Sequence, residues 1–170
     1  DLLEGPPAER SGIRMAIAKW ARPAPHTAPT ASKATGLYMI CTMAKHDAEA
    51  AGYADALMLD WRGQVAEATG ANIFFVMNGV LHTPTPDCFL DGITRRSVIG
   101  LARQRQLKVV ERAIMPAEMA SAQEAFLTGT AAEVTPIAEI GPYRFTVGEI
   151  TRGLMGDYDK LVRTPPAQAA

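Results

Sequence analysis

The sequence predicts an α+β domain built on a mixed, barrel-like β-sheet with flanking helices. Helical and strand-like segments are mixed along the chain without strict β–α–β alternation. Between two apolar runs stands the pair Asn78-Gly79, a strong hairpin signal that requires antiparallel pairing. The chain has 170 residues, of which 48% are hydrophobic and 21% charged, so it can form one sizeable globular domain.

The first half of the chain predicts one helix and several strands. Ile13, Met15 and Ile17 alternate with other residues, which predicts a strand, and three prolines keep residues 22–30 irregular. From Leu37 the apolar residues follow helical spacing until Gly52, which we expect to end the helix as a C-cap. Further strands are expected at 56–59, 65–68, 73–77 and 80–82, with turns at 61–63 and 78–79.

The second half predicts two long helices separated by strands. After a loop at 83–91, a helix is built on Val98, Leu101 and Ala102, with Thr94 as its N-cap and free N–H groups at 92–96. We then expect a strand at 108–114, a short helix at 116–122 that starts with proline, and strands at 124–127 and 134–140 around a turn at 129–132. A last helix at 149–162 precedes a Pro-Pro tail.

Charge and hydropathy exclude several classes of partner. The net charge is −1, so there is no electrostatic footprint for nucleic acid, and the short basic clusters at 95–96 and 103–105 indicate a solvated helix face. No apolar run approaches the roughly 20 residues that cross a bilayer, and no signal peptide is visible. We therefore expect a cytoplasmic protein with no membrane partner.

Cysteine and histidine usage predicts neither disulfides nor a metal. Cys41 and Cys88 are too few for a disulfide framework and indicate two reduced thiols. His26, His46 and His82 are isolated and show no metal-ligand spacing. We expect no bound metal.

Lys33 and Glu67 are the first candidate site residues. Lys33 lies among small and apolar neighbours just before the first predicted helix, and a semi-buried, neutral amine there could attack an aldehyde. The alternative is a solvated surface lysine. Glu67 has small and apolar flanks that favour a close-packed site, whereas the alternative is a charge on an exposed strand.

Two turns add anion-binding groups. Gly92-Ile93-Thr94 begins a helix and could bind a phosphate through its free N–H groups, or be an ordinary helix start. Gly129-Thr130-Ala131-Ala132 offers a hydroxyl and free amides, or is a plain turn between strands. Together, the amine, the carboxylate and the two turns are the parts of a pyridoxal phosphate (PLP) site, in which the carboxylate keeps the pyridine nitrogen protonated.

The order and sequence of these segments resemble the class IV aminotransferases, which are fold type IV PLP enzymes, and among them the branched-chain amino acid aminotransferases. The resemblance covers the chain from about Gly12 to Val162. The matching stretches are Trp20-Ala21-Arg22, His26-Thr27-Ala28-Pro29-Thr30, Lys33 through Tyr38, Ala66-Glu67, Asn72-Ile73-Phe74, Leu90-Asp91-Gly92-Ile93-Thr94-Arg95 and Gly129-Thr130-Ala131-Ala132-Glu133-Val134-Thr135-Pro136. The implied fold is that of the large domain of D-amino acid aminotransferase-like PLP enzymes.

The resemblance also implies a role for each site residue. Lys33 would form the Schiff base with PLP and carry a proton between the substrate Cα and the cofactor C4′. Tyr38 would bond the phenolic oxygen of the cofactor, and Glu67 would pair with its pyridine nitrogen. The phosphate would be held by the turn at Gly92, Ile93 and Thr94 and by the Thr130 side chain, while the Thr130 and Ala131 amides would help to receive the substrate carboxylate.

The implied activity is PLP-dependent transfer of an amino group from a branched-chain amino acid to 2-oxoglutarate, in a homodimer or a higher homo-oligomer. The sequence leaves three alternatives open. The chain could be a D-amino acid aminotransferase or an aminodeoxychorismate lyase, both of which use the same lysine. It could also be a non-catalytic truncated fragment of such an enzyme.

The domain organisation follows from the same resemblance. The chain starts at Asp1 rather than at Met, and residues 1–11 resemble an interdomain linker. We expect a PLP-binding large domain at 12–163 and a tail at 164–170. The smaller N-terminal domain, which in the family supplies an arginine to the phosphate, is expected to be absent from this chain.

Overall fold

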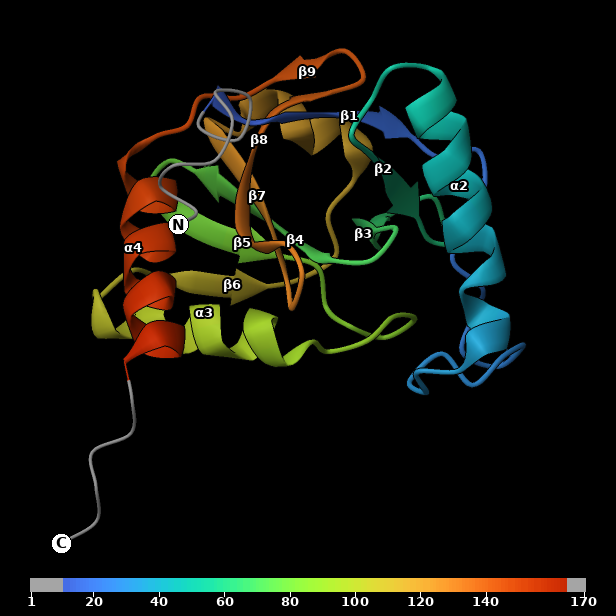
Figure 1. The fold of residues 1–170 in the computed structure, drawn as a ribbon, viewed down its shortest axis with the longest axis horizontal. Coiled ribbons are helices and arrows are strands. Elements are labelled where there is room, and N and C mark those ends of the chain that lie inside the picture. Colours follow the sequence, from blue (N-terminus) through green and yellow to red (C-terminus); the bar gives the residue numbers. More distant parts are fainter. Residues whose placement is uncertain (1–10, 165–170) are drawn as a thin grey trace, which may run out of the picture.

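The computed structural model describes residues 11–164, and within them a nine-stranded sheet curls into a half-barrel flanked by helices (Figure 1). The strands are β1 (Ile13–Ile17), β2 (Asp55–Leu59), β3 (Val65–Ala68), β4 (Asn72–Met77), β5 (Val80–Thr83), β6 (Val109–Glu111), β7 (Glu124–Gly129), β8 (Glu133–Ile140) and β9 (Tyr143–Arg144). The α-helices are α2 (Met39–Ala50), α3 (Ile93–Gln104) and α4 (Glu149–Arg163), and two short 3-10 helices are η2 (Thr35–Leu37) and η3 (Pro116–Ser121).

The sheet is mixed, which confirms the predicted α+β class. Its strands lie in the order β3-β2-β1-β8-β7-β4-β5-β6, and β9 pairs with β8. Strand β1 is parallel to both of its neighbours and β5 is parallel to β6, whereas the remaining pairs are antiparallel. None of the helices within residues 11–164 is long and apolar enough to cross a membrane.

The sheet curls because a short turn joins strands that are far apart in its order. Strand β3 lies at one edge, five places from β4. In a flat sheet five spacings of about 4.8 Å would separate these strands by about 24 Å. The chain between them is the turn at residues 69–71, and the four steps from Ala68 to Asn72 span at most about 14 Å. The edge must therefore bend toward β4.

Strand β4 is buried on both faces and divides the core in two. Ile73, Phe75 and Met77 point to one side, where they join Met15, Leu127 and Phe145 in one cluster. Phe74 and Val76 point to the other side and pack under α3 and α4, and the Phe74 and Phe126 rings are stacked. The alternation of side chains along the strand explains this division. Helix α2 packs separately, with Ala44 and Ala48 against Ala56 of β2.

Most predicted elements are confirmed within a few residues. Asn78 and Gly79 both have positive φ, 51° and 75°, as the hairpin between β4 and β5 requires. The C-cap of α2 is Ala51, and Gly52, which was predicted as the C-cap, follows it with φ 81°. The linker prediction falls almost wholly on residues 1–10 and most of the tail on 165–170, which lie outside the described part.

Three predictions about element bounds were wrong. Thr94 is not the N-cap of α3, because the helix begins at Ile93 and Gly92 takes the extended N-cap conformation. The strand expected at 108–114 is limited to β6, because by Ile114 the carbonyl bonds to Val65 of β3 instead. The first helix begins as η2 before α2 starts at Met39, and β9 was not predicted.

The start of α4 depends on a buried glutamate. Glu124 of β7 accepts a hydrogen bond from the backbone N–H of Thr151 at 2.8 Å, which satisfies one of the free donors of the helix. Gly148, the N-cap of α4, lies directly against the Glu124 carboxylate, so a Cβ at position 148 would collide with it.

Gly148→Ala should lower the free energy of unfolding by about 1–3 kcal/mol, because the added methyl group displaces the Glu124 carboxylate from Thr151. Gly156→Ala on the same helix is the matched control, since a Cβ there meets no atom within 4 Å. It should be neutral or stabilise by up to about 1 kcal/mol. Urea unfolding of both variants measures the difference, and equal effects would contradict this account.

Candidate functional site

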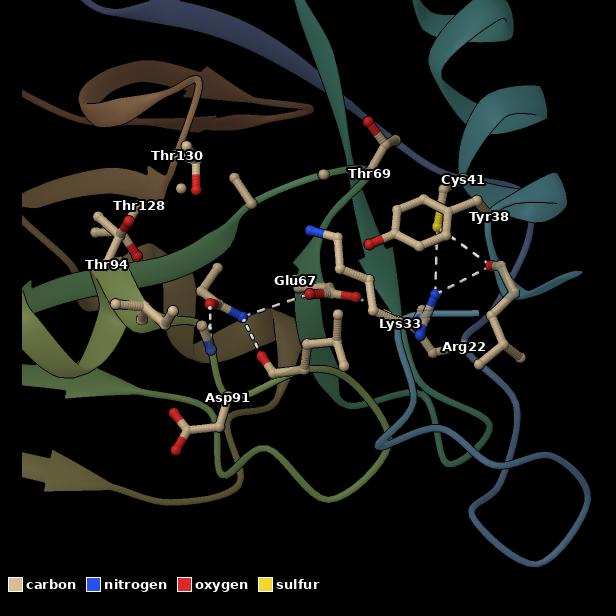
Figure 2. Close-up of a pocket in the computed structure, with 18 of the residues that line it drawn as sticks. Arg22, Lys33, Tyr38, Cys41, Glu67, Thr69, Asp91, Thr94, Thr128 and Thr130 are labelled. Atoms are coloured by element: carbon tan, nitrogen blue, oxygen red, sulfur yellow. Dashed lines mark hydrogen bonds and ion pairs between the residues drawn. The ribbon is translucent and has the colours of Figure 1, made fainter. Parts of the chain in front are cut away.

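One pocket of about 310 Å³ collects almost all of the predicted site residues (Figure 2). It lies between the segment before α2, strand β3 with the turn that follows it, the N-terminus of α3 and the end of β7. The predicted residues that line it are Lys33, Tyr38, Glu67, Gly92, Ile93, Thr94 and Thr130. Ala131 does not line the pocket and is exposed in the turn after β7.

Lys33 and Tyr38 both point into this pocket (Figure 2). Tyr38 is half-buried and stands at the N-cap of α2, so the start of the helix fixes its position. Lys33 is exposed, which corrects the expectation of a semi-buried amine. Its small neighbours Ala31 and Ser32 are themselves exposed and leave this side of the pocket open.

Glu67 is a buried carboxylate near the end of β3. Its Oε1 lies 3.4 Å from Arg22 Nε, and its Oε2 accepts a 3.4 Å hydrogen bond from the amide of Asn72. Burial raises the pKa of Glu67 to about 8, although the positive charge of Arg22 acts in the opposite direction. Glu67 is therefore poised to gain or lose a proton near neutral pH.

Arg22 is a buried cation that reasoning from the residues missed. Its side chain is held by the Leu37 carbonyl oxygen at 3.4 Å and by Cys41 Sγ at 3.2 Å. A bridge between Arg22 and Asp60 extends the parallel pairing of β1 and β2, and this pairing brings Arg22 toward Glu67. No spacing in the sequence indicates the contact, because Arg22 and Glu67 lie far apart along the chain.

The N-terminus of α3 offers free donors to the pocket. The first helical bond runs from the N–H of Arg96 to the carbonyl of Gly92, so the N–H groups of Ile93 and Thr94 have no acceptor within the helix. These donors and the helix dipole favour an anion. Thr94 is buried, and its hydroxyl lies 3.4 Å from that of Tyr158.

A buried hydroxyl beside the helix also lacks a partner. Thr128 of β7 lines the pocket, is 1% exposed, and its Oγ1 makes no hydrogen bond with any residue of the described range 11–164. Because buried polar groups are rarely left unpaired, the pocket is suited to a polar ligand. A carboxylate, an arginine, an amine and an anion-binding helix end therefore meet in one cavity.

A family model for the class IV aminotransferases matches residues 2–140. The chain belongs to the class IV aminotransferases. This class IV aminotransferase chain is 41% identical, over 157 residues, to a probable branched-chain-amino-acid aminotransferase of Aquifex aeolicus, with 89% of this chain and 50% of that protein covered. It is thus a homologue of the branched-chain aminotransferases, and it spans about half the length of the curated relatives it matches.

Solved structures agree with the fold of this class IV chain. The branched-chain aminotransferase of Thermoproteus uzoniensis, solved with norvaline, matches with a TM-score of 0.86 and 42% identity over 89% of this chain and 52% of that one. The branched-chain amino acid aminotransferase of Thermobaculum terrenum, solved in its PLP form, matches with a TM-score of 0.85 and 39% identity over 89% of this chain and 51% of that one. The predicted barrel-like fold of these PLP enzymes is confirmed.

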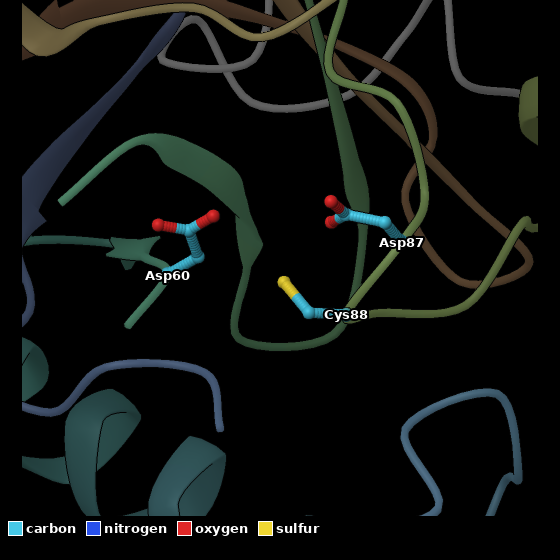
Figure 3. A group of neighbouring side chains, drawn as sticks. All are labelled: Asp60, Asp87 and Cys88. Carbon is cyan, nitrogen blue, oxygen red and sulfur yellow. The ribbon is translucent and has the colours of Figure 1, made fainter. Parts of the chain in front are cut away.

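A second cluster, Asp60, Asp87 and Cys88, lies outside the pocket (Figure 3). Its potential ligand atoms lie within 4.8 Å of one another, a grouping that sequence spacing did not predict. Arg62 contacts both carboxylates at 2.6 Å, and burial raises the pKa of Cys88 to about 12. The guanidinium therefore already offsets part of the carboxylate charge, and the thiol stays protonated at neutral pH.

The raised pKa of Glu67 predicts a pH dependence of stability in the cofactor-free protein. Between about pH 4.5 and 8 the folded state keeps a proton that the unfolded state releases, so the free energy of unfolding should fall as the pH rises. The change should be on the order of a few kcal/mol. Glu67→Gln should remove most of it, whereas Glu49→Gln, at an exposed position on α2, should not. Urea unfolding across this pH range measures the effect, and parallel curves for wild type and Glu67→Gln would contradict it.

Proposed function

We propose that this chain is the cofactor-holding part of a PLP-dependent aminotransferase that moves an amino group from a branched-chain amino acid to 2-oxoglutarate. The observation that carries the proposal is that Lys33, Tyr38, Glu67 and the N-terminus of α3 line the same pocket. The names of the relatives support the branched-chain preference, as does the turn sequence at 129–136.

The donor set fits PLP at each end of the molecule. The free N–H groups of Ile93 and Thr94 suit a phosphate, with the Thr130 hydroxyl beside them, and the Glu67 carboxylate suits a protonated pyridine nitrogen. The unpartnered hydroxyl of Thr128 leaves a further polar group for the ligand. When bound, PLP supplies an aldehyde and a ring that withdraws electrons from the substrate Cα.

The chain's own residues then divide the remaining tasks. The Lys33 amine acts as nucleophile and carries the proton at the substrate Cα, since it is the amine in the pocket. Tyr38 binds the phenolic oxygen of the cofactor, and Arg22 stabilises the ionised form of Glu67. We assign the Thr130 amide to the substrate carboxylate, whereas Ala131, which lies outside the pocket lining, has no assigned role. The functional assembly is proposed to be a homodimer or a higher homo-oligomer.

In this chain joined to the N-terminal domain of a branched-chain aminotransferase, Lys33→Ala should abolish transamination while leaving the fold intact. Removal of a catalytic nucleophile costs several powers of ten in rate, whereas a change at an exposed position costs about 0.5 kcal/mol of stability at most. Lys19→Ala is the matched control, because Lys19 does not line the pocket. Borohydride treatment with PLP followed by peptide mass spectrometry should place the cofactor on Lys33, and wild-type turnover in Lys33→Ala would end the proposal. Rates with leucine, D-alanine and aminodeoxychorismate distinguish the branched-chain activity from the two related enzymes.

The 170-residue chain alone should bind PLP weakly and show little or no activity. The phosphate carries about two negative charges, and Arg22, a buried cation of the pocket, is already paired with Glu67. Equilibrium dialysis with PLP measures the affinity, and addition of an N-terminal domain from a branched-chain aminotransferase should raise both affinity and rate. Tight binding and ordinary rates in the chain alone would show that its own residues complete the site.

A further inference from the structure

Asn72 contacts both ends of the pocket through one side-chain amide. It is the first residue of β4 and is buried. Its Nδ2 donates to the Leu90 carbonyl oxygen at 2.9 Å and to Glu67 Oε2 at 3.4 Å, and its Oδ1 accepts from the N–H of Gly92 at 3.2 Å. The amide thus uses its donor group toward Glu67 and Leu90 and its acceptor oxygen toward Gly92.

These contacts of Asn72 reach the two groups that would bind opposite ends of a ligand, the Glu67 carboxylate and the N-terminus of α3. Glu67 is the buried carboxylate, and Gly92 is the N-cap that sets where the free N–H groups of α3 begin. The bond to Leu90 fixes the loop that leads into the helix. Asn72 itself is fixed by the sheet, because its backbone pairs with Thr128 of β7.

Gly92 packs tightly against the Asn72 side chain. A Cβ at Gly92 would collide with Asn72 Oδ1, although the backbone of Gly92 has a negative φ that any residue can adopt. The absence of a side chain is thus required by contact with Asn72 and not by backbone conformation. The two residues fit one another and fix how closely α3 approaches β4.

We propose that Asn72 is a positioning residue that sets the distance between the Glu67 carboxylate and the N-terminus of α3. The pocket is thereby matched to one ligand that carries a protonated nitrogen at one end and a phosphate at the other. This inference rests on the proposed function. Aspartate could accept from Gly92 but could not donate to Leu90 or Glu67, so the amide is needed for both contacts.

The test compares the binding of PLP with that of pyridoxal, which lacks the phosphate. Both are measured in this chain joined to the N-terminal domain of a branched-chain aminotransferase. The protein carries Lys33→Ala, so that only non-covalent contacts contribute to binding. The dissociation constant of pyridoxal divided by that of PLP measures how much the phosphate adds to binding. Asn72→Ser should reduce this ratio at least about tenfold, the equivalent of one lost buried hydrogen bond. Gly92→Ala should reduce it as well, and the double variant Asn72→Ala/Gly92→Ala should be no worse than Asn72→Ala alone.

Thr83→Val is the matched control. Thr83 is buried in β5, its hydroxyl donates to the Ile73 carbonyl at 2.8 Å, and it does not line the pocket. Thr83→Val should lower the free energy of unfolding about as much as Asn72→Ser does, but it should leave the ratio of the two dissociation constants unchanged. If Asn72→Ser leaves the ratio within about twofold and behaves as Thr83→Val does, Asn72 is merely structural and the proposal is wrong.

A second measurement needs no substitution at Asn72. In the cofactor-free protein, Glu67→Gln should shift the backbone amide resonance of Gly92, since Asn72 bonds to both residues. An unshifted Gly92 resonance would overturn the proposal even if Asn72→Ser fails to fold. If the protein binds no PLP, the proposed function fails, but this resonance still decides the role of Asn72.

Discussion

The short turn at residues 69–71 is the constraint on which the shape of this molecule depends. It forces the edge strand β3 to bend toward β4, and so it converts a sheet of nine described strands into a half-barrel. The same turn sets Glu67, near the end of β3, beside Asn72 at the start of β4. Pairing of Asn72 with Thr128 then adds β7 to the same place. The turn that bends the sheet therefore also brings the pocket residues together.

Charge is distributed unevenly within the pocket. Glu67 is buried, and its pKa is raised because the attraction of Arg22 does not offset the loss of water around the carboxylate. A cationic atom placed at Glu67 would act in the same direction as Arg22 and favour the ionised form. At the other end, free N–H groups supply positive potential without any side-chain charge. Once Glu67 is ionised, its carboxylate and the N-terminus of α3 differ in sign, and that difference orients a ligand.

Local patterns predicted most of the elements, and the reasons for the failures are tertiary. The alternation in β1, the helical spacing in α2 and the Asn78-Gly79 pair act over neighbouring residues, so they could be read without the fold. Thr94 was misplaced as an N-cap because the start of α3 is fixed by Asn72, a residue from another strand. The strand at 108–114 was too long because the carbonyl of Ile114 bonds to β3.

The site residues divide in the same way, into those that the sequence predicted and those that only tertiary contacts bring to the pocket. Residue types and the family resemblance predicted Lys33, Tyr38, Glu67, Gly92, Ile93, Thr94 and Thr130, and the pocket contains all of them. Their roles stay predictions. Arg22 and Asn72 were missed as partners of Glu67, because strand order and register place them there and neither is visible in a linear pattern.

The fit between Gly92 and Asn72 also limits how the two positions can evolve. With asparagine at 72, any side chain at 92 is obstructed, so a mutation at 92 is harmful in that background. A smaller residue at 72 removes the obstruction and makes the same mutation tolerable. A change at either position alone therefore passes through a weakened intermediate, because a smaller residue at 72 also gives up the bonds to Glu67 and Leu90. The two positions, although distant in the chain, are thus constrained to change together.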